Sequence, residues 1–209
     1  FYPRGRTGNG TGRPDSGDWN SYLRFMDTQL TELLTKYGPV GAIWFDGVWD
    51  KDEQPYEDQP ALWNLYPQYE LIHTLQPGCL IGNNHHQKPY EGEDIQIFER
   101  DIPGQNEYGL SGQDISRLPL ETCQTMNESW GYRITDTNYK SSEDLIRYLV
   151  QTAGKGANLL LNIGPRPDGT LPEHALERLE AIGQWLSRYG DSIYGTKAGY
   201  IPAQDWGVS

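Results

Sequence analysis

Asp46 is the residue of this sequence best placed to do chemistry. It follows a short and wholly apolar run, residues 40–45, and Gly47 comes directly after it. A carboxylate at the end of a buried strand either faces a site or is paired, so a catalytic acid and a helix cap or salt-bridged loop acid are both open interpretations. Gly47 permits a tight turn or the close approach of a ligand, which favours the catalytic interpretation.

Polar and aromatic side chains also follow the later apolar runs, at 79–82, 94–98, 120–126 and 157–163. Flat aromatic faces commonly bind the apolar face of a sugar ring, although most tryptophans are packing residues. The aromatic candidates are Trp44, Trp49 and Trp130. The polar candidates for contacts to hydroxyl groups are His85 and His86, with loop structure as the alternative. Glu99 and Arg100 also stand at a strand end, and an ion pair of Arg100 with Asp101 or Glu99 would orient the loop there.

Several other chemistries find no support in the motifs. Adjacent histidines such as His85 and His86 point in different directions and lack the spacing of a zinc site, so we expect no metal. There is no GxSxG elbow, no GxGxxG and no GxxxxGK[ST], which argues against a serine hydrolase and against nucleotide cofactors. Neither Cys79 nor Cys123 has a plausible base beside it. We expect no cofactor.

The elements that would position these residues alternate between strand and helix. Short apolar runs predict strands at 40–45, 79–82, 94–98, 120–126 and 157–163, and helical periodicity predicts helices at 19–36, 62–75, 141–153 and 172–189. This alternation is typical of a parallel α/β fold, and about five strands with four helices fit the C-terminal part of a (β/α)8 barrel. Active sites of such barrels lie where the strands end, which is where the candidates stand.

The composition argues against some kinds of binding partner. The chain of 209 residues has a formal net charge of −12 and 17 Lys and Arg, so a basic face for nucleic acid is not expected. No apolar stretch approaches the roughly 20 residues of a membrane span. The first residue is Phe1 and no signal segment follows, which suggests a piece of a longer protein.

An acidic, aromatic-lined barrel piece with a carboxylate at a strand end favours glycoside hydrolysis, which needs two facing carboxyl groups.

Five groups of motifs, in order and with matching spacing, carry a resemblance from about residue 18 to residue 207. They are 40–47 (VGAIWFDG), 81–86 (IGNNHH), 92–96 (GEDIQ), 125–127 with 129–132 (TMN, SWGY), and 158–165 with 168–169 (NLLLNIGP, DG). Together they resemble the α-L-fucosidases of glycoside hydrolase family 29. The long loop after residues 94–98 resembles the branch of that family that acts on α1-3- and α1-4-linked fucose of branched, Lewis-type glycans. The resemblance implies a retaining mechanism with Asp46 as the nucleophile.

The same resemblance implies roles for the other candidate residues. Trp44 and Trp130 would line the fucose pocket and its leaving-group side. The remaining contacts to fucose or the neighbouring sugar would come from His85, His86, Glu99 and Arg100. An enzyme that trims such glycans would usually be exported, so we expect a periplasmic or extracellular location.

One position departs from the family pattern. Where the branch has Pro-Gly-Glu-Asn with the general acid/base glutamate, this chain has Gln105 within residues 103–106 (PGQN). Glutamine has no titratable proton, and losing a general acid/base costs typically about 10²–10⁴-fold in rate. Either an engineered change or a natural pseudoenzyme that binds fucose would explain it. If the alignment is shifted, Glu99 or Glu107 takes the role instead.

The resemblance also implies a division of the chain. Residues 1–198 would be a partial barrel that lacks its upstream strands, and residues 199–209 would begin a C-terminal β-sandwich. We therefore expect the chain to need the upstream half of the barrel to fold. Two other functions stay open: a fucose-binding protein without activity, and a barrel hydrolase for another sugar.

Overall fold

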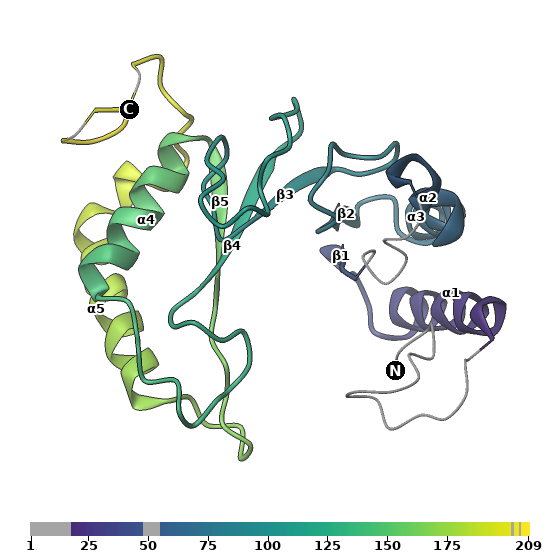
Figure 1. Ribbon diagram of the computed structural model, residues 1–209, viewed down its shortest axis with the longest axis horizontal. Coiled ribbons are helices and arrows are strands. Elements are labelled where there is room, and N and C mark those ends of the chain that lie inside the picture. Colours follow the sequence, from purple (N-terminus) through teal and green to yellow (C-terminus); the bar gives the residue numbers. More distant parts are fainter. Residues whose placement is uncertain (1–17, 48–54, 202, 205) are drawn as a thin grey trace. The chain divides into compact units, whose positions relative to one another are not determined.

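The computed structural model describes residues 18–47, 55–201, 203, 204 and 206–209 (Figure 1). Trp49 lies outside these residues. The described chain divides into two compact units. Unit 1 runs to His85 and includes 89–95, and unit 2 comprises 86–88 and the residues from Gln96 onward.

Unit 1 pairs two parallel strands with helices. Its elements are α1 (Trp19–Lys36), β1 (Ala42–Phe45), the 3-10 turn η2 (Tyr56–Asp58), α2 (Gln59–Leu62), α3 (Leu65–Leu75) and β2 (Leu80–Asn83). The side chain of Asp18 caps α1 by accepting the Asn20 amide at 3.1 Å. β1 and β2 pair in register from Ala42 with Leu80 to Phe45 with Asn83. Both strand ends therefore lie together.

The predicted helix over 62–75 begins later than expected. Asn64 adopts a left-handed conformation with φ of 56°, which separates α2 from α3. The short helix α2 thus ends at Leu62, and α3 begins three residues after the predicted start. The buried faces of α1, α3 and both strands meet in one apolar core. Its members include Leu30, Leu34, Phe45, Ile72 and Ile81.

Unit 2 repeats the pattern with β3 (Ile95–Glu99), β4 (Leu120–Thr125), α4 (Ser142–Gly154), β5 (Ala157–Asn162), α5 (Glu173–Tyr189) and the turn η3 (Gly190–Ser192). Strand β4 runs parallel to β3 on one side and to β5 on the other. Ser141 caps α4 by accepting the Asp144 amide at 3.0 Å. Apart from the start of α3, the predicted helices and strands are confirmed to within two residues at each end.

Neighbouring strands in each unit are also neighbours in sequence, as in a (β/α)8 barrel. Some strand side chains stay uncovered, including Trp44 at 37 % exposed and Leu160 at 46 %. Near the chain end an isolated antiparallel bridge joins Gln204 and Gly207. The β-sandwich over 199–209, the boundary at 198 and the need for an upstream half stay predictions. Among the described residues, no helix is both long and apolar enough to cross a membrane.

Candidate active site

Asp46 stands exposed just beyond the end of β1. Its Oδ1 accepts a hydrogen bond from the Asn84 side-chain amide at 3.3 Å. The Asn84 backbone amide also donates to the Phe45 carbonyl at 2.9 Å, which carries the β1–β2 pairing one step further. Gly47 has φ of +92°, a conformation that favours glycine, so the chain can turn directly after the carboxylate. Trp44 stands two residues earlier, on the same side of the strand.

Behind Asn84 lies a buried polar cluster, which we call the Glu93 cluster: Tyr69, Asn83, His85 and Glu93. The Tyr69 hydroxyl donates to Glu93 Oε1 at 2.9 Å and accepts from Asn83 Nδ2 at 2.8 Å. His85 Nε2 lies 3.1 and 3.2 Å from the two Glu93 oxygens. Burial, and then the Glu93 carboxylate, raise the pKa of Tyr69 far above its usual range, so it remains a donor.

The location of His85 bears on its predicted role. Its side chain is 2 % exposed and its ring lies tilted against that of Tyr90, with centroids 4.3 Å apart. The structure thus turns this imidazole toward Glu93 inside unit 1. Substrate contact by His85 stays a prediction, while its bond to Glu93 is a role that the sequence did not suggest.

In unit 2 the structure brings His86 and Glu99 together. His86 Nε2 lies 3.6 Å from Glu99 Oε2, and both side chains are largely buried. His86 and Arg100 have φ of 61° and 62°, a left-handed conformation that is uncommon outside glycine. Such strain clusters at functional sites, and here it falls on two residues singled out from the sequence.

Arg100 lies against two aromatic rings. Its guanidinium carbon is 5.2 Å from the Trp130 ring centre and 5.7 Å from that of Tyr108, within the range of cation–π attraction. Arg100 Nη2 also donates to the Glu128 carbonyl at 2.8 Å. Tyr108 is a neighbour that the sequence analysis missed, since nothing in the spacing links it to Arg100. Trp130 remains 36 % exposed, so part of its face is open to a ligand.

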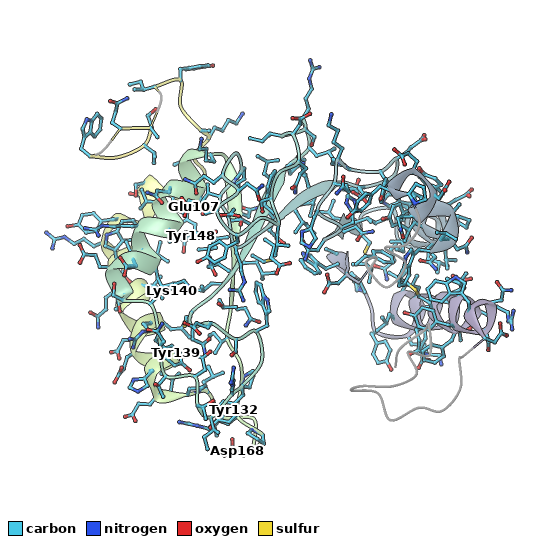
Figure 2. All side chains as sticks on the ribbon, viewed as in Figure 1. Glu107, Tyr132, Tyr139, Lys140, Tyr148 and Asp168 are labelled. Atoms are coloured by element: carbon cyan, nitrogen blue, oxygen red, sulfur yellow. The ribbon has the colours of Figure 1, made fainter. Side chains whose placement is uncertain are left out.

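The segment that carries Trp130 is fixed by the end of β5 and by Lys140. Asn162 Nδ2 donates to the Trp130 carbonyl at 2.7 Å, and a Cβ on Gly164 would approach the Tyr132 nitrogen to 2.5 Å. Lys140, labelled in Figure 2, donates from Nζ to the carbonyls of Thr125 and Asn127 at 2.8 and 3.2 Å. Burial, then the charge of Arg100, lower the pKa of Lys140. The motifs at 125–132 and 158–165 therefore meet in space.

Asp136 follows the segment that carries Trp130, and we expect its charged carboxylate to hold that segment in place. Its Oδ2 accepts the amides of Glu128 and Ser129 at 3.1 and 2.8 Å. Hydrogen bonds from the Ser129 hydroxyl and from these amides lower the pKa of Asp136. Because the pKa of Asp136 is lower in the folded protein than in the unfolded chain, its hydrogen bonds stabilise the fold above the unfolded pKa of about 3.9. This stabilisation is lost as the pH falls through the lower pKa of the folded protein.

We expect Asp136→Ala to speed hydrogen exchange of the Glu128 and Ser129 amides about tenfold at neutral pH, because one charged acceptor is removed. In the unmodified protein the same loosening should appear only below about pH 4. Amide exchange followed by NMR measures both. Asp168 accepts from Thr170 in a comparable turn, so Asp168→Ala is the matched control and should leave these amides unchanged.

Gln105 stands in the segment between β3 and β4. Its amide donates to the Ile102 carbonyl at 2.9 Å, and the buried Asp101 carboxylate fixes the segment by accepting the amides of Glu107 and Tyr108. The Gln105 side chain lines a cavity of about 270 Å³ together with α4 and residues 203, 204 and 206–208. Glu107 is exposed on the same segment (Figure 2). Arg100 and Trp130, which contact each other, also belong to unit 2 but do not line this cavity.

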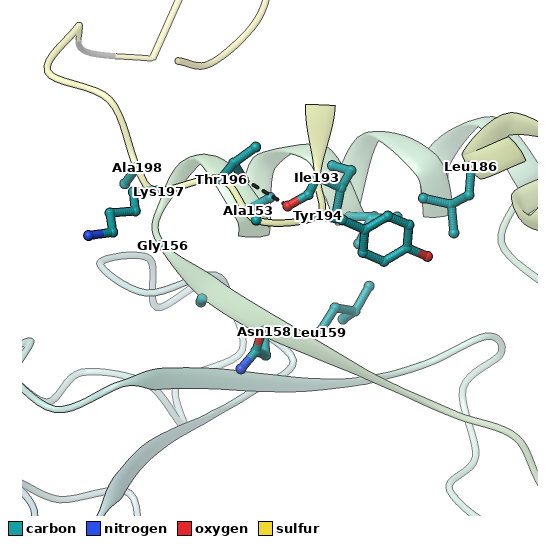
Figure 3. A pocket seen from close by; sticks show the side chains of 13 residues that line it. Ala153, Gly156, Asn158, Leu159, Leu186, Ile193, Tyr194, Thr196, Lys197 and Ala198 are labelled. Atoms are coloured by element: carbon teal, nitrogen blue, oxygen red, sulfur yellow. Dashed lines mark hydrogen bonds between the residues drawn. The ribbon is translucent and has the colours of Figure 1, made fainter. Parts of the chain in front are cut away.

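A larger cavity, of about 570 Å³, lies away from these residues (Figure 3). It is bounded by α4, residues 193–198 and the first residues of β5, Ala157 to Leu159. The candidates instead follow the other ends of the strands, so we do not assign this cavity to the site. Within the described ranges, no group of three or more His, Cys, Asp or Glu side chains could hold a metal ion.

Comparison with known proteins identifies the class. The family model described as Alpha-L-fucosidase matches residues 5–191, so the chain belongs to the α-L-fucosidase family of glycoside hydrolases. It is 32 % identical to an α-L-fucosidase of Branchiostoma floridae over 175 residues, which cover 81 % of this chain and 36 % of that protein. The chain thus spans about a third of the length of the curated relatives it matches.

Two solved structures show the same fold. α-L-fucosidase isoenzyme 1 of Paenibacillus thiaminolyticus matches with a TM-score of 0.77 and 33 % identity over 93 % of this chain and 46 % of that one. An α-L-fucosidase of Bacteroides thetaiotaomicron matches with a TM-score of 0.73 and 26 % identity, over 91 % of this chain and 45 % of that one. That structure is a covalent intermediate formed from 2-fluoro-fucosyl fluoride and trapped with a glutamate-to-glutamine mutant. These likenesses confirm the predicted parallel α/β fold.

Proposed function

We propose that the protein to which this chain belongs is a retaining α-L-fucosidase and that Asp46 is its nucleophile. The observation that carries the proposal is the exposed carboxylate just after β1, which accepts from the side-chain amide of Asn84 just after β2, within a chain of the α-L-fucosidase family. Positions just after the strands are where barrel enzymes keep their catalytic groups. An oxygen of Asp46 would attack the anomeric carbon, forming a fucosyl-enzyme as the glycosidic bond breaks.

The second carboxyl group of such an enzyme protonates the leaving oxygen and then deprotonates water, at about 5–5.5 Å from the nucleophile. Gln105 occupies its position in the family pattern and can do neither, because an amide has no transferable proton at neutral pH. The trapped Bacteroides relative, with glutamine in place of a glutamate, supports this assignment. We therefore expect the protein that contains this chain to form the fucosyl-enzyme from substrates with good leaving groups and to turn it over slowly.

Unit 2 by itself carries a surface that suits a sugar ring. The partly open Trp130 face and the Arg100 guanidinium, held by Tyr108 and Glu128, offer an apolar surface beside a hydrogen-bond donor. Such a pair suits a sugar ring that carries hydroxyls, and the substrate we propose is α1-3- or α1-4-linked fucose on branched, Lewis-type glycans. This substrate class also favours a periplasmic or extracellular location.

Gln105 supports a second function. Without an acid/base the same scaffold would bind fucosylated glycans without cleaving them, as a pseudoenzyme. A hydrolase for another sugar is the third possibility, since a shared fold does not fix a substrate.

A leaving-group test distinguishes these functions. The protein, unchanged at Gln105, is mixed with 2-chloro-4-nitrophenyl α-L-fucoside with and without azide. The phenolate leaves without protonation, so we expect a burst equal to one phenolate per site, followed by slow turnover. Azide needs no general base, so it should accelerate turnover and give α-L-fucosyl azide, in which the configuration is retained.

Absence of a burst together with measurable fucose binding would favour the pseudoenzyme. Faster release from the matching galactoside than from the fucoside would favour the third function. The product configuration is decisive for the mechanism, since β-L-fucosyl azide from the unmodified protein would contradict a covalent fucosyl-enzyme.

A further inference from the structure

We infer that Asn84 is a positioning residue for the Asp46 carboxylate and that the buried Glu93 cluster holds Asn84 in place. The inference rests on the proposed function of Asp46. Its basis is the direct contact, Asn84 Nδ2 to Asp46 Oδ1 at 3.3 Å, made by a side chain that is only 2 % exposed. Hydrogen bonding to a carboxylate favours its ionised form, and only the ionised form attacks a sugar carbon.

The neighbours of Asn84 explain why its amide points at Asp46. Asn83 and His85, on either side of it, both reach into the Glu93 cluster. Asn84 instead reaches the end of β1, and its backbone amide is fixed to the Phe45 carbonyl. The two flanking side chains therefore set the direction of the middle one.

Glu93 is the centre of this arrangement. A buried carboxylate is costly unless it is hydrogen-bonded, and Glu93 meets this requirement with the Tyr69 hydroxyl and the His85 ring. Gly92 next to it has φ of +95°, and a Cβ there would come within 3.1 Å of the Tyr69 ring. The close approach of this segment to α3 thus depends on the sequence Gly92-Glu93, for which the sequence analysis assigned no role.

The titratable groups packed around this strand end are engaged with one another. They are Tyr69 from α3, His85 after β2, and Tyr90 and Glu93 from the segment before β3. His73 and Asp94 pair separately at 3.0 Å, with Asp94 also accepting the Ile81 amide. Burial, then Glu93, raise the pKa of Tyr90, so both tyrosines stay neutral through the acid range.

The test uses covalent labelling by 2-fluoro-fucosyl fluoride, followed by intact mass and peptide mapping. In this step the bond from Asp46 to the anomeric carbon forms, and fluoride leaves with the electron pair of the breaking C–F bond. Fluoride needs little protonation, so the protein can be used with Gln105 unchanged. The labelling rate is measured from acid to neutral pH, and its acid limb reports ionisation of the nucleophile.

We expect Asn84→Ala to slow labelling about tenfold at the pH where the unmodified protein reacts fastest. Its acid limb should move about one pH unit upward. Asn84→Asp has the same size, but it replaces the donor by a second carboxylate. Its acid limb should therefore move further upward than that of Asn84→Ala. Asn20→Ala, an exposed asparagine of α1 in the same unit, is the control and should label like the unmodified protein.

The role of Glu93 is tested by combination. Glu93→Gln keeps the size of the side chain but removes its charge, and alone it should slow labelling. Combined with Asn84→Ala it should add almost nothing, because Glu93 acts through Asn84. A merely structural role would give additive losses.

The outcomes separate this inference from the proposed function. If the unmodified protein is labelled at Asp46 and both Asn84 variants keep its acid limb, the inference is wrong and the nucleophile assignment stands. If the label is absent from Asp46 in the unmodified protein, the proposed function fails and the inference falls with it.

Discussion

Asp46→Ala is expected to abolish release of phenolate from an activated aryl α-L-fucoside. Removal of the nucleophile from an enzyme that works through a covalent intermediate typically costs about 10⁴–10⁶-fold. The loss should appear in the burst itself, since no fucosyl-enzyme can form without the carboxylate. Rapid-mixing absorbance of the first turnover measures it directly.

The azide product makes this prediction specific. Alanine leaves a space beside the anomeric carbon from which azide can attack, so Asp46→Ala with azide should give β-L-fucosyl azide. The unmodified protein should give the α product. Asp58→Ala, which removes an exposed carboxylate of the same unit, is the matched control and should keep the burst. A burst of normal size from Asp46→Ala would place the nucleophile elsewhere.

The elements of this fold could be predicted because their signals are local. Asp18 and Ser141 each accept the first-turn amides of the helix that follows, and the apolar runs before Asp46 and Gly164 form strands. Helix caps and apolar periodicity act within a few residues, so the sequence displays them directly. The exception is the start of α3, where Asn64 adopts a left-handed conformation and interrupts the helix. The apolar residues around Asn64 continue the helical periodicity, so the sequence gives no sign of this interruption.

The site was predictable only in part. Asp46, His86, Glu99, Arg100 and Trp130 are candidates because each follows an apolar run, and contacts within unit 2 join His86 to Glu99 and Arg100 to Trp130. The surrounding groups were missed because they come from distant positions. Glu93 meets Tyr69 across 24 residues, and Asn84 meets Asp46 across 38. Such contacts depend on how strands and helices pack, for which a single sequence carries no local signal.

The second large effect is expected from Gln105→Glu. If Gln105 occupies the acid/base position, restoring the carboxyl group should raise fucose release from a Lewis-type trisaccharide by about 10²–10⁴-fold. The sugar leaving group needs a proton, so the gain should be much smaller with the activated aryl fucoside. Rescue by azide should fall, because water would again be activated by a base. The pH profile should become bell-shaped, since the nucleophile must be ionised and the acid protonated.

The decisive control for this change is Gln151→Glu. Gln151 is an exposed residue of α4 that lines the same cavity as Gln105. The substitution Gln151→Glu therefore introduces the same charge nearby without placing a proton donor at position 105. Its trisaccharide activity should stay at the level of the unmodified protein. If the unmodified protein already cleaves the trisaccharide rapidly, then Glu99→Gln and Glu107→Gln decide which carboxyl is the acid/base. Glu99 is largely buried against His86, whereas Glu107 is exposed, so a loss with Glu99→Gln would move the proton-transfer role to the end of β3.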